Sequence, residues 1–196
     1  TAGSGAEVTS NAVIYVDGIK HSFESELLLP DNFFLIPEFL ISAPDEIKSS
    51  AGFDAIAQAL ESLISVKSND DSVKYASDSL KLSIKSFSSF LKNPNIKNAS
   101  EMSIASNLAG KAINISKTTA AHAWSYGISM HHNIPHGHAV WFTLPKIFEV
   151  HSSNTDPKNS SGTIIVAFIQ GSEIFSILTG SGISVGLCKL IVDPSF

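Results

Sequence analysis

The sequence predicts a mainly α-helical domain that follows a short β-rich segment. From residue 45 to about residue 150, apolar residues recur at steps of three and four, which is the period of an amphipathic helix. Residues 1–45 instead hold short apolar runs that are interrupted by turn residues. The change occurs at Ser42-Ala-Pro-Asp-Glu, so we expect residues 1–45 to be the edge of one domain and residues 46–196 to be a helical domain.

The first predicted element is a β-hairpin. Ala12–Val16 and Ile19–Phe23 are two apolar runs joined by Asp17-Gly18, and an Asp-Gly pair supplies the positive φ angles of a tight turn. The next run, 33–36, reads Phe-Phe-Leu-Ile and predicts a short buried strand.

The first long helix is expected to begin near Pro44, because proline and acidic residues favour a helix N-terminus. Its apolar face comprises Phe53, Ile56, Leu60, Leu63 and Ile64. A second set, called the polar stripe below, comprises Asp54, Gln58, Glu61 and Ser65.

Further helices are expected downstream. Asn69-Asp-Asp-Ser is an N-cap signal, and it precedes apolar residues at helical spacing up to Leu91. Residues 100–116 predict a helix whose alanines and Gly110 allow close approach of neighbouring elements. Two short helices are expected around His122 and after Pro135, and residues 152–162 read as a polar loop.

Composition excludes several classes of protein. The 196 residues are 43% hydrophobic with a formal net charge of −5, and the basic residues are scattered, so no nucleic-acid partner is expected. No apolar run reaches the roughly 18–20 residues of a membrane span, so no membrane partner is expected. Cys188 is alone and forms no internal disulfide, which fits a cytoplasmic protein.

Four separated side chains suggest a metal site. Asp54 and Gln58 are four residues apart, so they share one helix face, and His122 and His136 follow later in the chain, fourteen residues from each other. Taken singly, each is more often a solvated or core residue. Taken together, a carboxylate and two imidazoles suit a divalent ion such as Fe²⁺ or Zn²⁺. Pro135 would start a helix beside His136, and Gly137 would let another group approach closely.

The same segments resemble the iron-containing (group III) alcohol dehydrogenase family. That family carries a Thr-Ala-Gly-(Thr/Ser)-Gly-Ser-Glu-Val-Thr segment, similar to residues 1–9, and a Gly-X-Asp-Ala-X-X-His helix, similar to residues 52–58. It also carries a histidine followed fourteen residues later by that of a Pro-His-Gly turn, as with His122 and His136 here. Residues 58–68, 107–119 and 134–140 are similar to the phosphonoacetaldehyde reductase branch.

The resemblance implies a dehydroquinate synthase-like fold. Residues 1–45 would be the C-terminal edge of an α/β dinucleotide-binding domain, and residues 46–196 a truncated helical metal-binding domain. The family's Gly-Gly-Gly-Ser pyrophosphate motif lies upstream of the segment seen here, so we expect an internal fragment with little activity alone. The full-length protein is expected to be a homo-oligomer.

The resemblance also implies the reaction, which is metal-dependent reduction of an aldehyde by NAD(P)H, with phosphonoacetaldehyde giving 2-hydroxyethylphosphonate. The residues it implies for the metal are Asp54, Gln58, His122 and His136; for NAD(P)H, Thr1, Ala2, Gly3, Ser4, Gly5, Asn11, Lys20 and Leu40; for proton transfer, Tyr126 and His132; and for the phosphonate, Lys111 and Lys117.

Two positions depart from the family pattern. Gln58 stands where the family usually has a histidine ligand, and Tyr126 stands where it often has a further histidine. Three alternatives therefore stay open: a general aldehyde reductase of the same family, a dehydroquinate synthase-like lyase with a different ligand set, and a non-catalytic helical module.

Overall fold

The computed structural model of the chain describes residues 3–17 and 19–154. Short elements come first, and the α-helices of the described residues then follow one another at gaps of two to five residues. In order, the elements are η1 (Ala6–Val8), β1 (Asn11–Val16), β2 (Ile19–Glu24), η2 (Glu26–Leu28), α1 (Pro37–Ser42), α2 (Asp45–Ile64), α3 (Asp70–Lys92), α4 (Ile96–Ser116), α5 (Ala120–His132) and α6 (His136–Asn154). The mainly helical prediction is confirmed.

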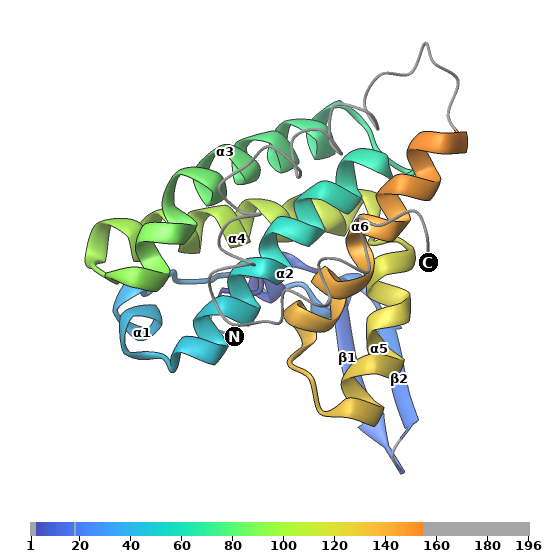
Figure 1. Ribbon diagram of the computed structural model, residues 1–196, viewed down its shortest axis with the longest axis horizontal. Coiled ribbons are helices and arrows are strands. Elements are labelled where there is room, and N and C mark those ends of the chain that lie inside the picture. The colour runs from blue at the N-terminus through green and yellow to red at the C-terminus, as the bar shows by residue number, and fades with distance from the viewer. Residues whose placement is uncertain (1–2, 18, 155–196) are drawn as a thin grey trace, which may run out of the picture.

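Helix α2 lies at the centre of the helical part, where it packs against α3, α4 and α6 (Figure 1). Its glycine and alanines let these neighbours approach, and every residue from Gly52 to Ser62 is buried. The largest fully buried side chains around it are Phe53, Phe87, Phe90, Phe148, Ile56, Leu60 and Leu144. Because α2 is enclosed from Gly52 to Ser62, the part of the polar stripe formed by Asp54, Gln58 and Glu61 cannot be a solvated face.

Asparagine side chains define two of the helix starts. Asn69 forms a capping box with Ser72 at the start of α3, as the sequence predicts. Asn95 does the same with Asn98, so α4 begins at Ile96, four residues before the predicted start. A further asparagine ends a helix: the C-cap of α5 is Asn133, whose φ of 53° and ψ of 35° lie in the left-handed region that asparagine tolerates.

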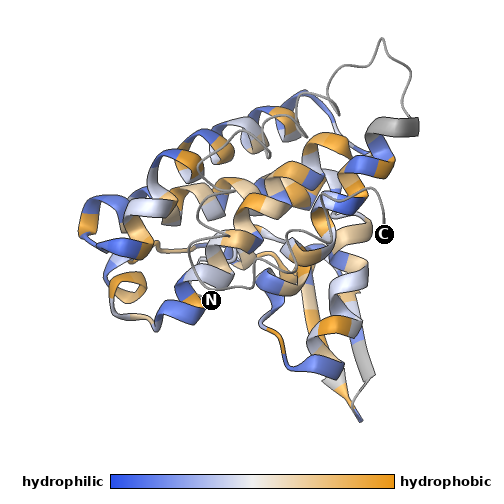
Figure 2. Cartoon of the chain, viewed as in Figure 1, coloured by the Kyte–Doolittle hydropathy of each residue, from blue (hydrophilic) through white to orange (hydrophobic). Residues whose placement is uncertain are grey.

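The predicted hairpin is confirmed, with β1 and β2 antiparallel and Asn11 opposite Glu24. It projects from the helical part, and Figure 2 shows hydrophobic residues on β1 as well as within the helices. The prediction of a buried strand at residues 33–36 is wrong. That run is irregular and exposed, with Phe34 at 86% exposure, because no described strand pairs with it and Pro37 starts α1 directly after it.

The N-terminal turn, residues 3–8, packs against α4. Gly5 has a φ of 70°, and a Cβ on it would lie 2.3 Å from the Ser106 carbonyl oxygen and 2.9 Å from Gly110. Only glycine at both positions allows this approach, and the small residues predicted in α4 serve it. Asn107 Nδ2, also on α4, donates to Glu7 Oε1 at 2.9 Å and so adds a hydrogen bond between the turn and this helix.

The end of the described chain differs from the predicted polar loop, since α6 continues to Asn154. Residues 155–162 of that loop, and the rest of the predicted 46–196 domain, lie outside the described residues. Among the helices that are described, none is both long and apolar enough to cross a membrane.

Candidate metal centre

The site begins with the buried polar stripe of α2. Asp54 is 6% exposed, Gln58 5% and Glu61 0%. Burying such groups is costly unless each finds a hydrogen-bonding partner, so the stripe must be matched by polar groups from other elements. Helices α5 and α6 and the N-terminal turn provide them.

His122 lies between two carboxylates. It is buried in the first turn of α5, where its Nε2 is 3.1 Å from Asp54 Oδ1 and its Nδ1 contacts Glu61 Oε2. Burial alone would lower the pKa of His122, but hydrogen bonds and charges from Asp54 and Glu61 outweigh it and raise the pKa to about 9. The metal-free imidazole therefore carries a proton on both nitrogens at neutral pH.

His136 approaches the same carboxylate from the start of α6. Its Nε2 is 3.6 Å from Asp54 Oδ1, and its Nδ1 is 3.4 Å from Ser125 Oγ. Gly137 makes this possible, since its N–H donates to Ser50 Oγ at 3.0 Å and a Cβ would lie 1.8 Å from the Ser50 carbonyl oxygen. The close approach expected of Gly137 is thus to the backbone of α2.

One donor atom each from Asp54, His122 and His136 lies within 4.8 Å of the others. These three residues are called the Asp54 cluster below. Tetrahedral Zn–N and Zn–O bonds of about 2.0–2.2 Å place neighbouring ligands roughly 3–4 Å apart, so small side-chain movements would enclose an ion. The carboxylate and two imidazoles suit Zn²⁺ or Fe²⁺. The three residues meet as the sequence analysis expects, and their role as ligands stays a prediction.

Gln58 adds a second indication. Its Nε2 donates to Asp54 Oδ2 at 2.9 Å and to the Ser4 carbonyl oxygen at 3.2 Å, which fixes the orientation of the amide. The opposite atom, Oε1, is buried and has no hydrogen-bond partner. A buried acceptor beside the cluster needs a partner, and a cation or a ligand hydroxyl would supply one.

The residues expected to bind the nicotinamide cofactor are only partly described. Thr1 and Ala2 lie outside the described residues, as does the Lys20 side chain. The turn formed by Gly3, Ser4 and Gly5 lies beside the cluster through the Ser4–Gln58 hydrogen bond.

The other two residues expected to bind the cofactor have contacts within the fold. Leu40 is buried in α1, where its Cδ2 would lie 3.3 Å from a Cβ on Gly3, so it packs close to the turn. Asn11 is exposed in the hairpin, where its side chain is hydrogen-bonded to that of Ser22 at 3.0 Å. Their cofactor roles stay predictions.

The two residues expected to transfer protons lie in different places. Tyr126 stacks on His136, with ring centroids 5.9 Å apart and an angle of 19° between the planes, so it is beside the cluster. His132 is exposed in the last turn of α5. It is about 15 Å along the helix axis from His122, at a rise of about 1.5 Å per residue.

The two lysines expected to bind the substrate already have partners. Lys111 Nζ lies 5.8 Å from the Phe33 ring centroid and 5.9 Å from that of Tyr75. Lys117 pairs with Glu24 and donates to the Asn114 carbonyl oxygen at 3.1 Å, and the same Lys117 pair lowers the pKa of the Glu24 carboxyl. The structure does not bring either lysine into the Asp54 cluster.

Glu61 is the residue that sequence reasoning missed. Burial raises the pKa of its carboxyl, but hydrogen bonds and charge from His122, with the Thr119 hydroxyl, lower it below the usual value. A signal was present, because Asp54, Gln58 and Glu61 recur at steps of four and three and the residues between them are mostly alanines. A helix with small apolar residues on its remaining sides is enclosed, and its polar residues then face partners rather than water.

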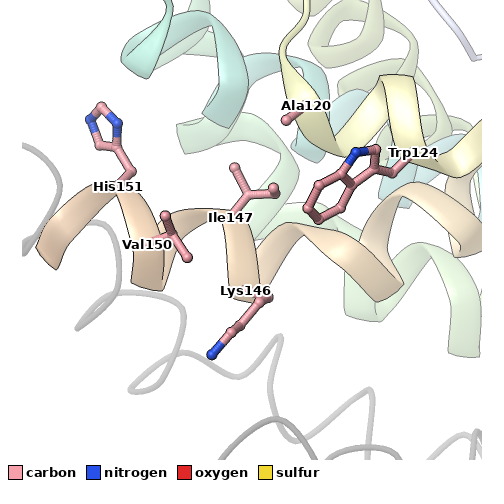
Figure 3. Close-up of a pocket in the computed structure, with 6 residues that line it drawn as sticks. All are labelled: Ala120, Trp124, Lys146, Ile147, Val150 and His151. Atoms are coloured by element: carbon pink, nitrogen blue, oxygen red, sulfur yellow. The ribbon is translucent and has the colours of Figure 1, made fainter. Parts of the chain in front are cut away.

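A separate pocket lies between α5 and α6 (Figure 3). It is lined by Ala120, Trp124, Lys146, Ile147, Val150 and His151, and its surface is largely apolar. None of these residues belongs to the Asp54 cluster. Since the pocket lacks converging polar groups, the chemistry is better assigned to the cluster.

Comparison with known proteins shows what the chain is similar to. Residues 48–172 match the C-terminal domain of the Fe-containing alcohol dehydrogenase family. The chain is 32% identical over 140 residues to 1-propanol dehydrogenase from Salmonella typhimurium, covering 70% of this chain and 38% of that protein. It is 26% identical over 152 residues to phosphonoacetaldehyde reductase from Streptomyces viridochromogenes, covering 75% and 38%.

A solved structure is also similar. The crystal structure of sulfoacetaldehyde reductase from Bifidobacterium kashiwanohense in complex with NAD⁺ has a TM-score of 0.73 and 33% identity, covering 76% of this chain and 41% of that one. The chain spans about two fifths of the length of these relatives. The matched domain contains every described member of the cluster, and the chain belongs to the Fe-containing alcohol dehydrogenase family.

Proposed function

We propose that the complete protein is a metal-dependent aldehyde reductase that uses NAD(P)H. The observation that carries this proposal is the convergence of Asp54, His122 and His136, whose donor atoms lie within 4.8 Å of one another. The orphaned Gln58 Oε1 beside them supports it. Membership of a family of alcohol dehydrogenases supplies the reaction class.

In this proposal Asp54, His122 and His136 hold Fe²⁺ or Zn²⁺, and Gln58 Oε1 is a weak fourth ligand or a substrate contact. The ion would polarise the aldehyde oxygen and the nicotinamide would supply hydride to the carbonyl carbon. The alkoxide oxygen left by hydride addition to the carbon would then need a proton. Tyr126 is the nearer candidate donor because it stacks on His136, and His132 is the more distant one.

The domain division is part of the proposal. Residues 1–45 would be the edge of a dinucleotide-binding domain, and residues 46–196 the helical metal-binding domain. Two observations support this division: apolar residues between Leu27 and Ile36 are exposed, and the N-terminal turn contacts Gln58 through Ser4. We also propose that the complete protein is a cytoplasmic homo-oligomer.

The proposed substrate is a short aldehyde with an anionic group, of which phosphonoacetaldehyde is the leading case. Relatives named as phosphonoacetaldehyde reductase and sulfoacetaldehyde reductase support an aldehyde of this chemical class. Lys111 and Lys117 are the candidate contacts for the anion. A phosphonate would have to draw Lys117 from Glu24 and Lys111 from its aromatic neighbours.

The second candidate is a general aldehyde reductase without selectivity for an anion. The relative named 1-propanol dehydrogenase supports it, as do the existing partners of both lysines. The two candidates differ only in the contribution of the anionic group to substrate binding.

NAD(P)H oxidation by the complete gene product would decide between them. Phosphonoacetaldehyde, sulfoacetaldehyde and propanal should be compared in the wild type and in Lys111→Ala, Lys117→Ala and the control Lys85→Ala, whose lysine pairs with Glu101 away from the cluster. Loss of a phosphonate–lysine contact is expected to raise KM about tenfold or more for the anionic aldehydes alone. Equal turnover of propanal in all variants and no preference for anionic aldehydes would favour the general reductase.

A metal titration of Gln58→His would define the role of Gln58. Imidazole is the better ligand for iron or zinc, so the variant should bind metal more tightly if Gln58 is a weak ligand. Unchanged affinity would assign Gln58 to substrate contact or to support of the N-terminal turn.

A further inference from the structure

Glu61 connects α2 to α5 through both of its carboxylate oxygens. Oε1 accepts hydrogen bonds from the Thr119 N–H at 3.1 Å, from the Thr119 hydroxyl, and from the Ala121 N–H at 3.0 Å. Oε2 contacts His122 Nδ1. The side chain is fully buried, so no water competes for either oxygen.

The Oε1 contacts replace a missing helix cap. A helix begins with N–H groups that have no intrahelical partner, and an N-cap side chain usually accepts from the second or third of them. Thr119 is the N-cap residue of α5 but its side chain makes no such bond, because its hydroxyl donates to Glu61. The carboxylate of α2 therefore caps α5 from outside, where its charge also suits the positive end of the helix dipole.

The Oε2 contact determines which nitrogen of His122 faces the cluster. An ionised carboxylate only accepts hydrogen bonds, so Nδ1 must carry a proton. Nε2 is then the nitrogen that can give up its proton, and it is the one that lies 3.1 Å from Asp54 Oδ1. A carboxylate behind a metal-binding histidine fixes both its tautomer and its ring orientation.

We propose that Glu61 is a positioning residue that keeps the proton of His122 on Nδ1 and so presents Nε2 to the divalent ion. This inference rests on the proposed metal centre. It assigns to one side chain two linked tasks, which are the placement of the first turn of α5 and the orientation of the His122 ring.

The substitution Glu61→Gln separates these tasks. Its amide oxygen can still accept from the α5 backbone, whereas its NH₂ group donates to His122 Nδ1 and favours the tautomer with the proton on Nε2. We expect the affinity of the complete protein for Zn²⁺ to fall about 10–100-fold, as for loss of other carboxylates behind metal ligands. Circular dichroism and thermal melting would verify that the variant is folded.

The matched control is Thr119→Ala, which removes one hydrogen bond to Glu61 Oε1 and leaves the Oε2 contact in place. Its Zn²⁺ affinity should stay within about twofold of wild type. An equal loss of affinity in Thr119→Ala and Glu61→Gln would mean that Glu61 acts only as a helix cap, and would overturn the inference.

A third measurement needs no variant to fold. In the wild-type protein loaded with Zn²⁺ and containing ¹⁵N-labelled histidine, NMR should show His122 with a proton on Nδ1 and the metal on Nε2. Metal on Nδ1 would overturn the inference while leaving the metal centre intact. Failure of the wild-type protein to bind Zn²⁺ or Fe²⁺ would instead overturn the proposed function itself.

Discussion

The middle of α2 buries Asp54, Gln58 and Glu61, whereas the segment from Leu27 to Ile36 exposes apolar side chains. Leu27 is 94% exposed, while Glu61 is 0% exposed. The buried carboxylates are matched by His122, Gln58 and the first amides of α5, so the polar interior is built from this chain alone. The apolar segment has no comparable cover among the described residues. The candidate metal centre is therefore supported by contacts within the described helices, whereas the proposed domain division would leave the Leu27–Ile36 segment to be covered by another part of the complete protein.

The largest expected effect is on metal binding. Asp54→Asn keeps the shape of the side chain but removes the charge shared by both histidines, so Zn²⁺ affinity should fall by more than the roughly 10–100-fold lost with an outer carboxylate. Isothermal titration would measure this, with Asp45→Asn as the control because Asp45 is exposed and pairs with Lys48. Unchanged Zn²⁺ affinity in Asp54→Asn would show that the buried cluster does not bind the metal ion.

The pH dependence of the metal-free protein should report the charge on His122. Its pKa is raised from 6.5 to about 9, so the stabilisation is fully present below about pH 6.5 and is lost as the pH rises through about 9. A shift of this size corresponds to a loss on the order of 3 kcal/mol in the free energy of unfolding. Urea denaturation between pH 6 and pH 10, in roughly unit steps, would measure it. His122→Gln should flatten the profile, and an equally steep profile in that variant would assign the dependence to another group.

A matched pair of glycines tests the contact between α6 and α2. A Cβ on Gly137 would lie 1.8 Å from the Ser50 carbonyl oxygen and 3.0 Å from Asp54 N, so Gly137→Ala must displace the turn that carries His136. We expect a cost of about 1–3 kcal/mol or more, with weaker metal binding. Gly127→Ala meets nothing within 4 Å and should stabilise α5 by about 0.5–1 kcal/mol. Thermal unfolding of both variants measures the difference, and equal melting temperatures would contradict the close approach.

The smallest expected effect is in the exposed segment. In the 196-residue chain, Leu27→Ser should change stability by less than about 0.5 kcal/mol, as for other exposed positions. In the complete gene product it should be clearly more destabilising, since the proposed dinucleotide-binding domain would cover this side chain. Val66→Ser, at a fully exposed position between α2 and α3, is the control and should be neutral in both proteins. Equal effects of Leu27→Ser in the two proteins would argue against the domain division.

Local signals in the sequence were enough to predict most of the fold. Asn69 caps α3 through its own side chain and that of Ser72, so the start of the helix is encoded within four residues. The same chemistry at Asn95 begins α4 four residues before the predicted start, because two asparagines form a box that the apolar period does not reveal. The run at residues 33–36 has the composition of a strand, but a strand also needs a partner, and no described strand supplies one.

For the candidate site, the sequence was enough to predict which candidate ligands would meet, but not which residues would support them. Asp54, His122 and His136 were found from residue type and family spacing, and the fold brings them together. Glu61 was assigned to the polar stripe without a role, because two of its partners are backbone amides at the start of α5, which carry no mark in the sequence, and its contact with His122 spans sixty-one residues. The bond from Gln58 to the Ser4 carbonyl oxygen was missed for the same reason.

The most direct test of the metal centre is a crystal structure of the complete protein grown with Zn²⁺, with anomalous diffraction measured at the zinc edge. We expect one strong anomalous peak about 2.0–2.2 Å from Asp54, His122 Nε2 and His136 Nε2. A protein saturated with Zn²⁺ that shows no peak at these three residues, or a peak held by other side chains, would contradict this expectation.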